Sequence, residues 1–177
     1  MRENTILGCV LAGGQAQRFG SDKALAEFEG RTLLSLAVDR LSGWCDHVVV
    51  VGREAAPAPT LPDWPRPGMG PLGGIAAALR LAADEGHALV LTIGVDAPRL
   101  PDDLPELLSP APACLAAQPV IGLWPVSAAT VIEDILRRDG RHSLRQFAEA
   151  VGARMVDLGS EPANVNTPAD LAALRPK

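Results

Sequence analysis

Short apolar runs alternate with helical segments along this chain, and this alternation limits the folds it can adopt. The apolar runs cover residues 5–11, 47–51 and 87–95, and each is bounded by glycine or aspartate. Segments 32–41 and 72–83 carry leucine, alanine or valine at helical spacing. Strands separated by helices imply a mainly parallel, Rossmann-like sheet with helices on both faces. The expected fold class is therefore α/β with a doubly wound sheet.

The chain has 177 residues, which is enough for one domain with a sizeable core. We find no repeat or linker, so a single domain is expected over residues 1–177. Residues 57–71 contain six prolines and two glycines, and so long a loop suggests a functional role. The other expected elements are short strands within 114–123 and over 154–158, and helices over 101–108, 126–137, 143–151 and 168–174. Asp102 and Asp103 are expected in the first turn of the helix over 101–108.

The most distinctive motif follows the first apolar run, where residues 11–23 read LAGGQAQRFGSDK. Gly13 and Gly14 carry no side chains, so an anion can reach the backbone N–H groups. Arg18 and Lys23 follow and add two cations. Bare amides and cations together predict a cradle for a polyphosphate. The alternative is an ordinary strand–turn–helix corner with surface cations.

Two familiar nucleotide loops are excluded by the spacing. A Walker-type loop needs Gly-Lys-Ser/Thr, but Gly20 is followed by Ser21. The dinucleotide fingerprint Gly-x-Gly-x-x-Gly is absent because the glycines are adjacent.

Asp96 directly follows the third apolar run and precedes Pro98. A carboxylate at the carboxyl end of a strand suits Mg²⁺, which is commonly held by one or two carboxylates plus phosphates and waters. An aspartate in this position can also cap the following turn. The residue alone leaves both roles open.

Charge and composition argue against nucleic acid and membranes as partners. The formal net charge is −5 with no basic tract, which argues against nucleic acid as a partner. Residues 107–132 carry no charge but contain four prolines, so a membrane helix is not expected. The N-terminus shows no secretory signal, and we expect a cytoplasmic protein.

The cysteines and histidines predict no reactive or metal centre. The three cysteines at positions 9, 45 and 114 show no Cys-x-x-Cys spacing, which favours buried thiols over disulfides or a zinc site. The three histidines at 47, 87 and 142 are expected to form no cluster and to be structural.

The LAGG…RFGSDK string resembles the signature of nucleotidyltransferases, and more narrowly that of the molybdenum cofactor guanylyltransferases. That family has methionine where Phe19 stands. Four further motifs carry the resemblance, in order: Asp63 seven residues before Gly70-Pro71-Leu72; Asp96-x-Pro98-x-x-Pro101; Pro119-Val120-Ile121-Gly122-Leu123-Trp124; and Asn164-Val165-Asn166-Thr167-Pro168.

The resemblance implies a sheet of the nucleotide-diphospho-sugar transferase type and a Mg²⁺-dependent enzyme. Such an enzyme transfers GMP from GTP to the phosphate of molybdopterin and releases pyrophosphate. Transient contacts with cofactor-delivery proteins or molybdoenzymes are further implied partners. The implied catalytic residues are Arg18, Lys23 and Asp96, with Asp96 as the metal ligand. The implied ligand-binding residues are Leu11, Ala12, Gly13, Gly14, Lys23, Asp63, Gly70, Asp96, Asn164 and Asn166.

Three departures from the family pattern keep alternatives open. An asparagine common at the end of the second strand is replaced here by Val51 or Gly52. The segment 109–118 is short, and Gln118 replaces a histidine found in some members. The alternatives are a cytidylyltransferase acting on the same acceptor, and a nucleotide-binding carrier or regulator with weakened transfer activity.

Overall fold

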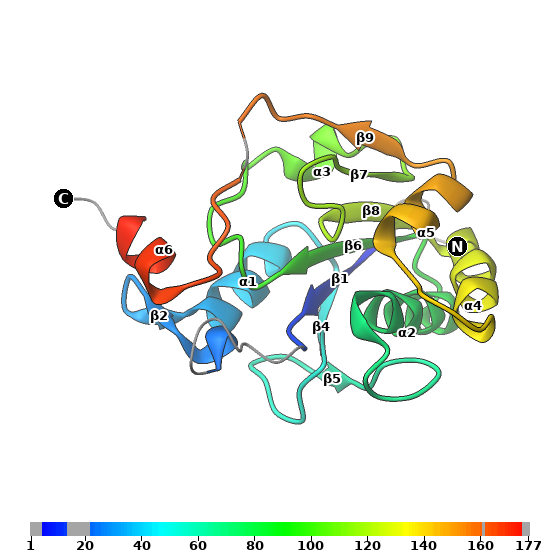
Figure 1. Cartoon of the computed structure of the whole chain (residues 1–177), viewed down its shortest axis with the longest axis horizontal. Coiled ribbons are helices and arrows are strands. Elements are labelled where there is room, and N and C mark those ends of the chain that lie inside the picture. Colours follow the sequence, from blue (N-terminus) through cyan, green and yellow to red (C-terminus); the bar gives the residue numbers. More distant parts are fainter. Residues whose placement is uncertain (1–4, 14–21, 161, 175–177) are drawn as a thin grey trace.

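A seven-stranded sheet runs through the structure, a computed structural model that describes residues 5–13, 22–160 and 162–174. Its strands are β1 (Ile6–Leu11), β4 (His47–Val51), β5 (Thr60–Leu61), β6 (Leu89–Gly94), β7 (Ala113–Leu115), β8 (Gly122–Pro125) and β9 (Arg154–Val156). They lie side by side in the order β5-β4-β1-β6-β8-β7-β9 (Figure 1). A small second sheet pairs β2 (Glu27–Phe28) with β3 (Arg31–Thr32).

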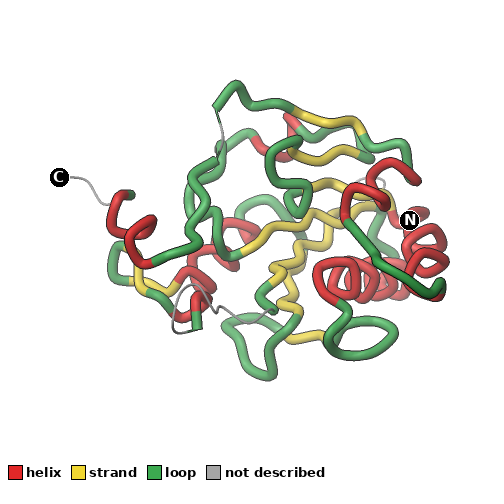
Figure 2. Tube along the Cα trace, viewed as in Figure 1, coloured by secondary structure: helices red, strands yellow, loops and turns green. Residues whose placement is uncertain are grey.

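Helices flank this sheet on both sides (Figure 2). They are α1 (Leu33–Ser42), α2 (Gly70–Glu85), α3 (Leu104–Leu107), α4 (Ala129–Arg137), α5 (Leu144–Ala150) and α6 (Pro168–Ala173), with short 3₁₀ helices η1 (Lys23–Leu25) and η2 (Val126–Ala128). Over the described ranges, none of these helices has the length and apolar character needed to cross a membrane.

The centre of the sheet is parallel, as the alternation of strands and helices predicts. β1 pairs in parallel with β4 on one side and with β6 on the other, and β4 pairs in parallel with β5. Leu11, the last residue of β1, lies opposite Val51 and Gly94, the last residues of β4 and β6. Three carboxyl ends therefore meet at one edge of the sheet.

Two apolar cores fill the space between the sheet and its helices. One lies under α1 and includes Leu34, Leu41 and Val10, and it extends to Leu171 of α6. The other lies under α2, α4 and α5 and includes Ile75 and residues of the two later helices. Figure 1 shows α1 and α2 on opposite sides of the central strands. Burying apolar residues on both faces explains why the central strands are almost wholly apolar.

β8 runs antiparallel to both β6 and β7, which the sequence pattern did not predict. Its Trp124 is fully buried, and the indole Nε1–H donates to Thr92 Oγ1 (3.0 Å). The indole also covers Gly122, where a Cβ would lie 2.4 Å from Trp124 Cζ2. The Gly-Leu-Trp motif therefore has a packing role in this sheet.

The prediction for Asp102 and Asp103 was wrong. The helix starts at Leu104, with Pro105 in its first turn, and the acid in that turn is Glu106. Pro105 favours this start because its missing N–H would be unsatisfied there anyway. Asp102 instead pairs with Arg40 of α1 at 2.6 Å and accepts the Trp44 indole N–H on its carbonyl oxygen.

Candidate functional site

Two glycines lie back to back at the edge where β1, β4 and β6 end, the edge at which open α/β sheets bind ligands. Gly13 follows β1 and Gly52 follows β4. A Cβ on Gly52 would lie 2.4 Å from Gly13 Cα, and Gly52 has a φ of +89°. Only glycine adopts that conformation without strain. The two loops therefore pack backbone against backbone, and Gly13 remains exposed.

One backbone N–H of the predicted phosphate cradle already forms a hydrogen bond within the sheet. The N–H of Ala12 donates to the carbonyl oxygen of Val51 (2.9 Å) and extends the pairing of β1 with β4. This amide is therefore committed to the fold rather than to a ligand. Leu11 packs against α2, where a Cβ on Gly74 would lie 2.5 Å from Leu11 Cδ2. Gly14 and Arg18 lie outside the described residues.

Lys23 and Asp96 come from separate motifs and lie together at this edge. Lys23 Nζ is 3.9 Å from Asp96 Oδ2, and the two side chains are 22% and 28% exposed. This distance exceeds that of a hydrogen bond, which is typically 2.7–3.2 Å between nitrogen and oxygen. The carboxylate and the ammonium therefore face each other without a tight contact, and both remain accessible to a ligand.

Asp22 and Arg53 position Lys23. The Asp22 carboxylate accepts the N–H of Ala24 (3.2 Å) and so caps η1, which begins at Lys23. Arg53 Nη1 lies 2.9 Å and 2.7 Å from the two Asp22 carboxylate oxygens, and the Arg53 side chain is only 18% exposed. This ion pair ties the loop after β4 to the start of η1. Sequence reasoning missed Arg53, although a cation two residues beyond a strand end is a usable signal.

Gly94, the last residue of β6, determines where the Asp96 carboxylate can lie. A Cβ at position 94 would lie 2.6 Å from Asp96 Oδ1. Apart from the adjacent residues, the next two nearest atoms also belong to Asp96, at 3.7 Å and 4.0 Å. The carboxylate thus folds back over bare backbone, and sequence reasoning missed this role of Gly94.

The predicted Asn164–Asn166 segment lies beside Asp96. The N–H of Val165 donates to the Asp96 backbone carbonyl oxygen (2.6 Å), and the Val165 side chain is fully buried. Asn164 is exposed and Asn166 half-buried. Val165 therefore anchors the segment and holds both asparagines close to the predicted metal ligand.

The first turn of α6 places another carboxylate near Lys23. Asp170 accepts the N–H groups of Asn166 and Thr167 (both 2.9 Å), and Thr167 Oγ1 accepts the Asp170 N–H in a reciprocal capping box. The bond from the Asn166 N–H is the main reason why the Asp170 pKa lies below its ordinary value, and the Lys23 charge adds to this. Thr167 is thus the N-cap of α6, at the start of the helix expected over residues 168–174.

Asp63 and Gly70 lie at the start of α2. Asp63 Oδ2 accepts the N–H of Met69 (3.2 Å), and a Cβ on Gly73 would lie 3.1 Å from Asp63 Cβ. Asp63 thus closes the proline-rich loop against the helix. Gly70 has a φ of +70° and is exposed, with open space around its Cα.

The thiols are unsuited to nucleophilic chemistry. All three cysteines are free, and Cys9 and Cys114 are buried. Burial raises the pKa of Cys9 and Cys114, and it raises that of Cys45 to about 12. The expectation of unpaired thiols is confirmed, although Cys45 is only half-buried.

The expectation that the histidines form no cluster was wrong for two of them. His47 Nδ1 lies 3.2 Å from His87 Nε2, although 40 residues separate them in the chain. The parallel arrangement of β4 and β6 around β1 brings them together at the amino end of the sheet. This edge is opposite to that of Lys23 and Asp96.

Comparisons with known proteins agree with this architecture. The chain is 38% identical to the molybdenum cofactor guanylyltransferase of Acidiphilium cryptum (strain JF-5) over 93% of this chain and 91% of that protein. It is 36% identical to the molybdenum cofactor guanylyltransferase of Rhizobium johnstonii over 94% and 90% of the respective chains.

The molybdopterin-guanine dinucleotide biosynthesis protein A of Archaeoglobus fulgidus has a similar fold. The TM-score is 0.75 at 21% identity, with 94% of this chain and 95% of that chain covered. The family model of the MobA-like NTP transferase domain matches residues 8–157. This chain therefore belongs to the MobA-like NTP transferase family.

Proposed function

We propose that this enzyme transfers GMP from GTP to the phosphate of molybdopterin, forming a guanine dinucleotide cofactor and releasing pyrophosphate. The observation that carries the proposal is the pair of Lys23 and Asp96, 3.9 Å apart at the carboxyl edge of the sheet. Relatives that are 33–38% identical over most of their length are named molybdenum cofactor guanylyltransferases, which supports guanylyl transfer.

In the proposed reaction, an oxygen of the acceptor phosphate attacks the α-phosphorus of GTP. A new P–O bond forms there, and the bond from the α-phosphorus to the bridging oxygen of the β-phosphate breaks. Negative charge grows on the departing pyrophosphate and on the α-phosphate oxygens. Lys23 is proposed to lie beside these phosphates as one cation, and Arg18 is proposed to supply a second one. Electrostatic help of this kind is most of what a protein adds to phosphoryl transfer.

The nucleotidyltransferase family suggests a divalent metal ion, and we propose Mg²⁺ held by Asp96. Asp96 fits this role because its carboxylate is accessible and because its backbone carbonyl, not its carboxylate, takes the Val165 N–H. One carboxylate completed by phosphate and water oxygens is a usual Mg²⁺ environment. When bound, Mg²⁺ would neutralise charge that develops on the phosphates.

The guanine base is proposed to lie between the Gly13 loop and the start of α2. Gly70 and Gly13 are both exposed and offer backbone without side chains. Asp63 keeps the proline-rich loop closed against α2 through its bond to Met69. Asn164 and Asn166 are proposed to contact the acceptor, since Val165 holds them beside Asp96.

The cytoplasm is the proposed site of the reaction, since it holds GTP and keeps thiols such as these three reduced. Pyrophosphate release tests the function. We expect release that requires GTP, molybdopterin and a divalent ion together. Nucleotide binding without pyrophosphate release would identify a carrier rather than a transferase.

A further inference from the structure

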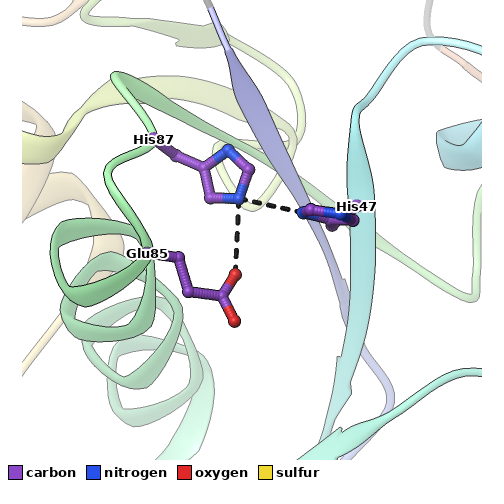
Figure 3. Close-up of side chains that lie close together, drawn as sticks. All are labelled: His47, Glu85 and His87. Carbon is purple, nitrogen blue, oxygen red and sulfur yellow. Dashed lines mark hydrogen bonds and ion pairs between the residues drawn. The ribbon is translucent and has the colours of Figure 1, made fainter. Parts of the chain in front are cut away.

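Three side chains with metal-binding atoms converge at the amino end of the sheet, away from Asp96. His47 is the first residue of β4, Glu85 is the last residue of α2, and His87 lies two residues before β6. Figure 3 shows the His47 ring and the Glu85 carboxylate both directed at the same edge of the His87 ring.

The two distances from His87 are close to those between ligand atoms of one metal ion. His87 Nε2 lies 3.2 Å from His47 Nδ1 and 3.4 Å from Glu85 Oε2. Each of the three residues offers one ligand atom, and these ligand atoms all lie within 4.8 Å of one another. Zinc binds imidazole nitrogen and carboxylate oxygen at about 2.0–2.2 Å in tetrahedral geometry, which places ligand atoms roughly 3.3–3.6 Å apart. We propose that His47, Glu85 and His87 bind a divalent transition-metal ion of the Zn²⁺ type.

The donor set selects the class of metal. Two imidazoles and one carboxylate suit Zn²⁺ and its first-row neighbours, whereas Mg²⁺ and Ca²⁺ prefer oxygen ligands. Three protein ligands leave a fourth position for water. The site therefore takes a different metal class from the one proposed at Asp96.

Hydrogen bonds alone do not satisfy all the polar groups of this cluster. A neutral imidazole has one N–H, and His87 Nε2 faces both an imidazole nitrogen and a carboxylate oxygen. Within the described part of the chain, the buried Nδ1 of His87 has no partner, so the polar contacts of this ring all converge on Nε2. A cation in front of Nε2 satisfies the three groups at once.

The backbone holds the ligands in place. His87 is 6% exposed, and its N–H donates to the Ala82 carbonyl oxygen (2.8 Å) just beyond the left-handed Gly86 that ends α2. His47 pairs in register with Leu7 of β1. The carboxyl end of a helix also favours a nearby cation. Sites on rigid elements of this kind need little rearrangement to bind a metal.

The consequence of binding is a cross-link between the end of α2 and the start of β4. The cross-link lies at the opposite end of β4 from Gly52, five residues or about 16.5 Å away along the strand at roughly 3.3 Å per residue. The metal is therefore expected to stabilise the fold without taking part in transfer. An ion that binds only the folded state raises Tm, by roughly 5–10 °C at 100 times its Kd.

Calorimetric titration of tag-free, metal-stripped protein with Zn²⁺ tests the proposal. We expect one equivalent to bind at this site and Tm to rise. His47→Ala and Glu85→Gln change exposed residues and should each weaken binding by more than about tenfold, since loss of even an outer-shell partner costs 10–100-fold. Tetrahedral Co²⁺ should give visible absorption bands in the wild type that both variants lose.

Two controls separate this site from other metal sites. His142→Ala removes the remaining histidine, and Asp96→Asn removes the carboxylate at the other edge. Both should keep wild-type Zn²⁺ affinity and the rise in Tm. Equal Zn²⁺ binding by wild type, His47→Ala and Glu85→Gln, or no binding by the wild type, would overturn the proposal.

Discussion

The ammonium of Lys23 lies 3.9 Å from a carboxylate oxygen of Asp96, although the two residues are 73 positions apart in the chain. Lys23 begins a 3₁₀ turn that Asp22 caps and Arg53 holds in place. Asp96 follows β6 and folds back over Gly94. The position of the Lys23 charge thus depends on Asp22 and Arg53, and that of the Asp96 charge depends on Gly94.

Loss of the Lys23 charge should lower transfer without unfolding the protein. Lys23→Gln is expected to reduce kcat/KM for GTP by about 10², a typical cost for a group that stabilises developing charge. Lys23→Arg should restore part of the rate, and Arg18→Ala should act in the same direction as Lys23→Gln. Arg137→Gln is the control, because Arg137 is exposed on α4. A wild-type kcat/KM in Lys23→Gln would contradict the phosphate-cradle hypothesis.

Asp96→Asn should remove the proposed metal ligand while keeping the size of the side chain. We expect transfer to fall by about 10²–10³ and the dependence on Mg²⁺ concentration to shift upward. Asp102→Asn, at a carboxylate that is 93% exposed and paired with Arg40, should change neither. An unchanged Mg²⁺ dependence in Asp96→Asn would make Asp96 a structural residue.

Gly94→Ala should impair transfer, and only because it displaces the Asp96 carboxylate. The new Cβ would lie 2.6 Å from Asp96 Oδ1, so the carboxylate must rotate away, while the backbone can stay in place. Activity should fall by up to about 10²-fold, as misplacement by about 1 Å can cost, and the unfolding midpoint in denaturant should stay near wild type.

A double-mutant cycle provides the control for this effect. If Gly94 acts by positioning Asp96, the Gly94→Ala and Asp96→Asn changes together should be no worse than Asp96→Asn alone. Additive losses would show that Gly94 acts elsewhere.

Asp170 should make the free energy of unfolding decrease as the pH falls into the acid range. Its pKa is lowered in the folded state, so between the lowered and the ordinary value the unfolded chain binds more protons than the folded one. The stabilisation that Asp170 contributes is therefore fully present above the ordinary aspartate pKa of about 3.9. It is lost as the pH falls through the lowered pKa of the folded state.

Chemical unfolding from about pH 6 down to below pH 3 measures this contribution. Asp170→Asn should lower stability near pH 6 and flatten its decline in acid. Asp139→Asn, at an exposed position beyond α4, should keep the wild-type slope. Parallel curves for wild type and Asp170→Asn would contradict the role of this capping carboxylate.

Local sequence patterns predicted the elements that position the site. The apolar run 47–51 is β4 to the residue, and the runs before Gly13 and Asp96 are β1 and β6 with slightly shorter bounds. These predictions succeed because a strand buried on both faces must be apolar throughout and must end where polar or glycine residues begin.

Contacts between distant segments could not be predicted in this way. The His47–His87 contact joins positions 40 residues apart, and the Arg53–Asp22 pair joins positions 31 apart. Both depend on strand order, which periodicity does not encode. The antiparallel direction of β8 and the pairing of Asp102 with Arg40 were missed for the same reason.

Mass spectrometry of the reaction product tests the central claim most directly. Purified protein, Mg²⁺, molybdopterin and equimolar GTP, CTP, ATP and UTP should yield mainly the guanine dinucleotide, because a buried polar group left unpaired by the wrong base costs roughly 1–3 kcal/mol. A cytosine dinucleotide as the main product, or no dinucleotide at all, would contradict guanylyl transfer by this enzyme.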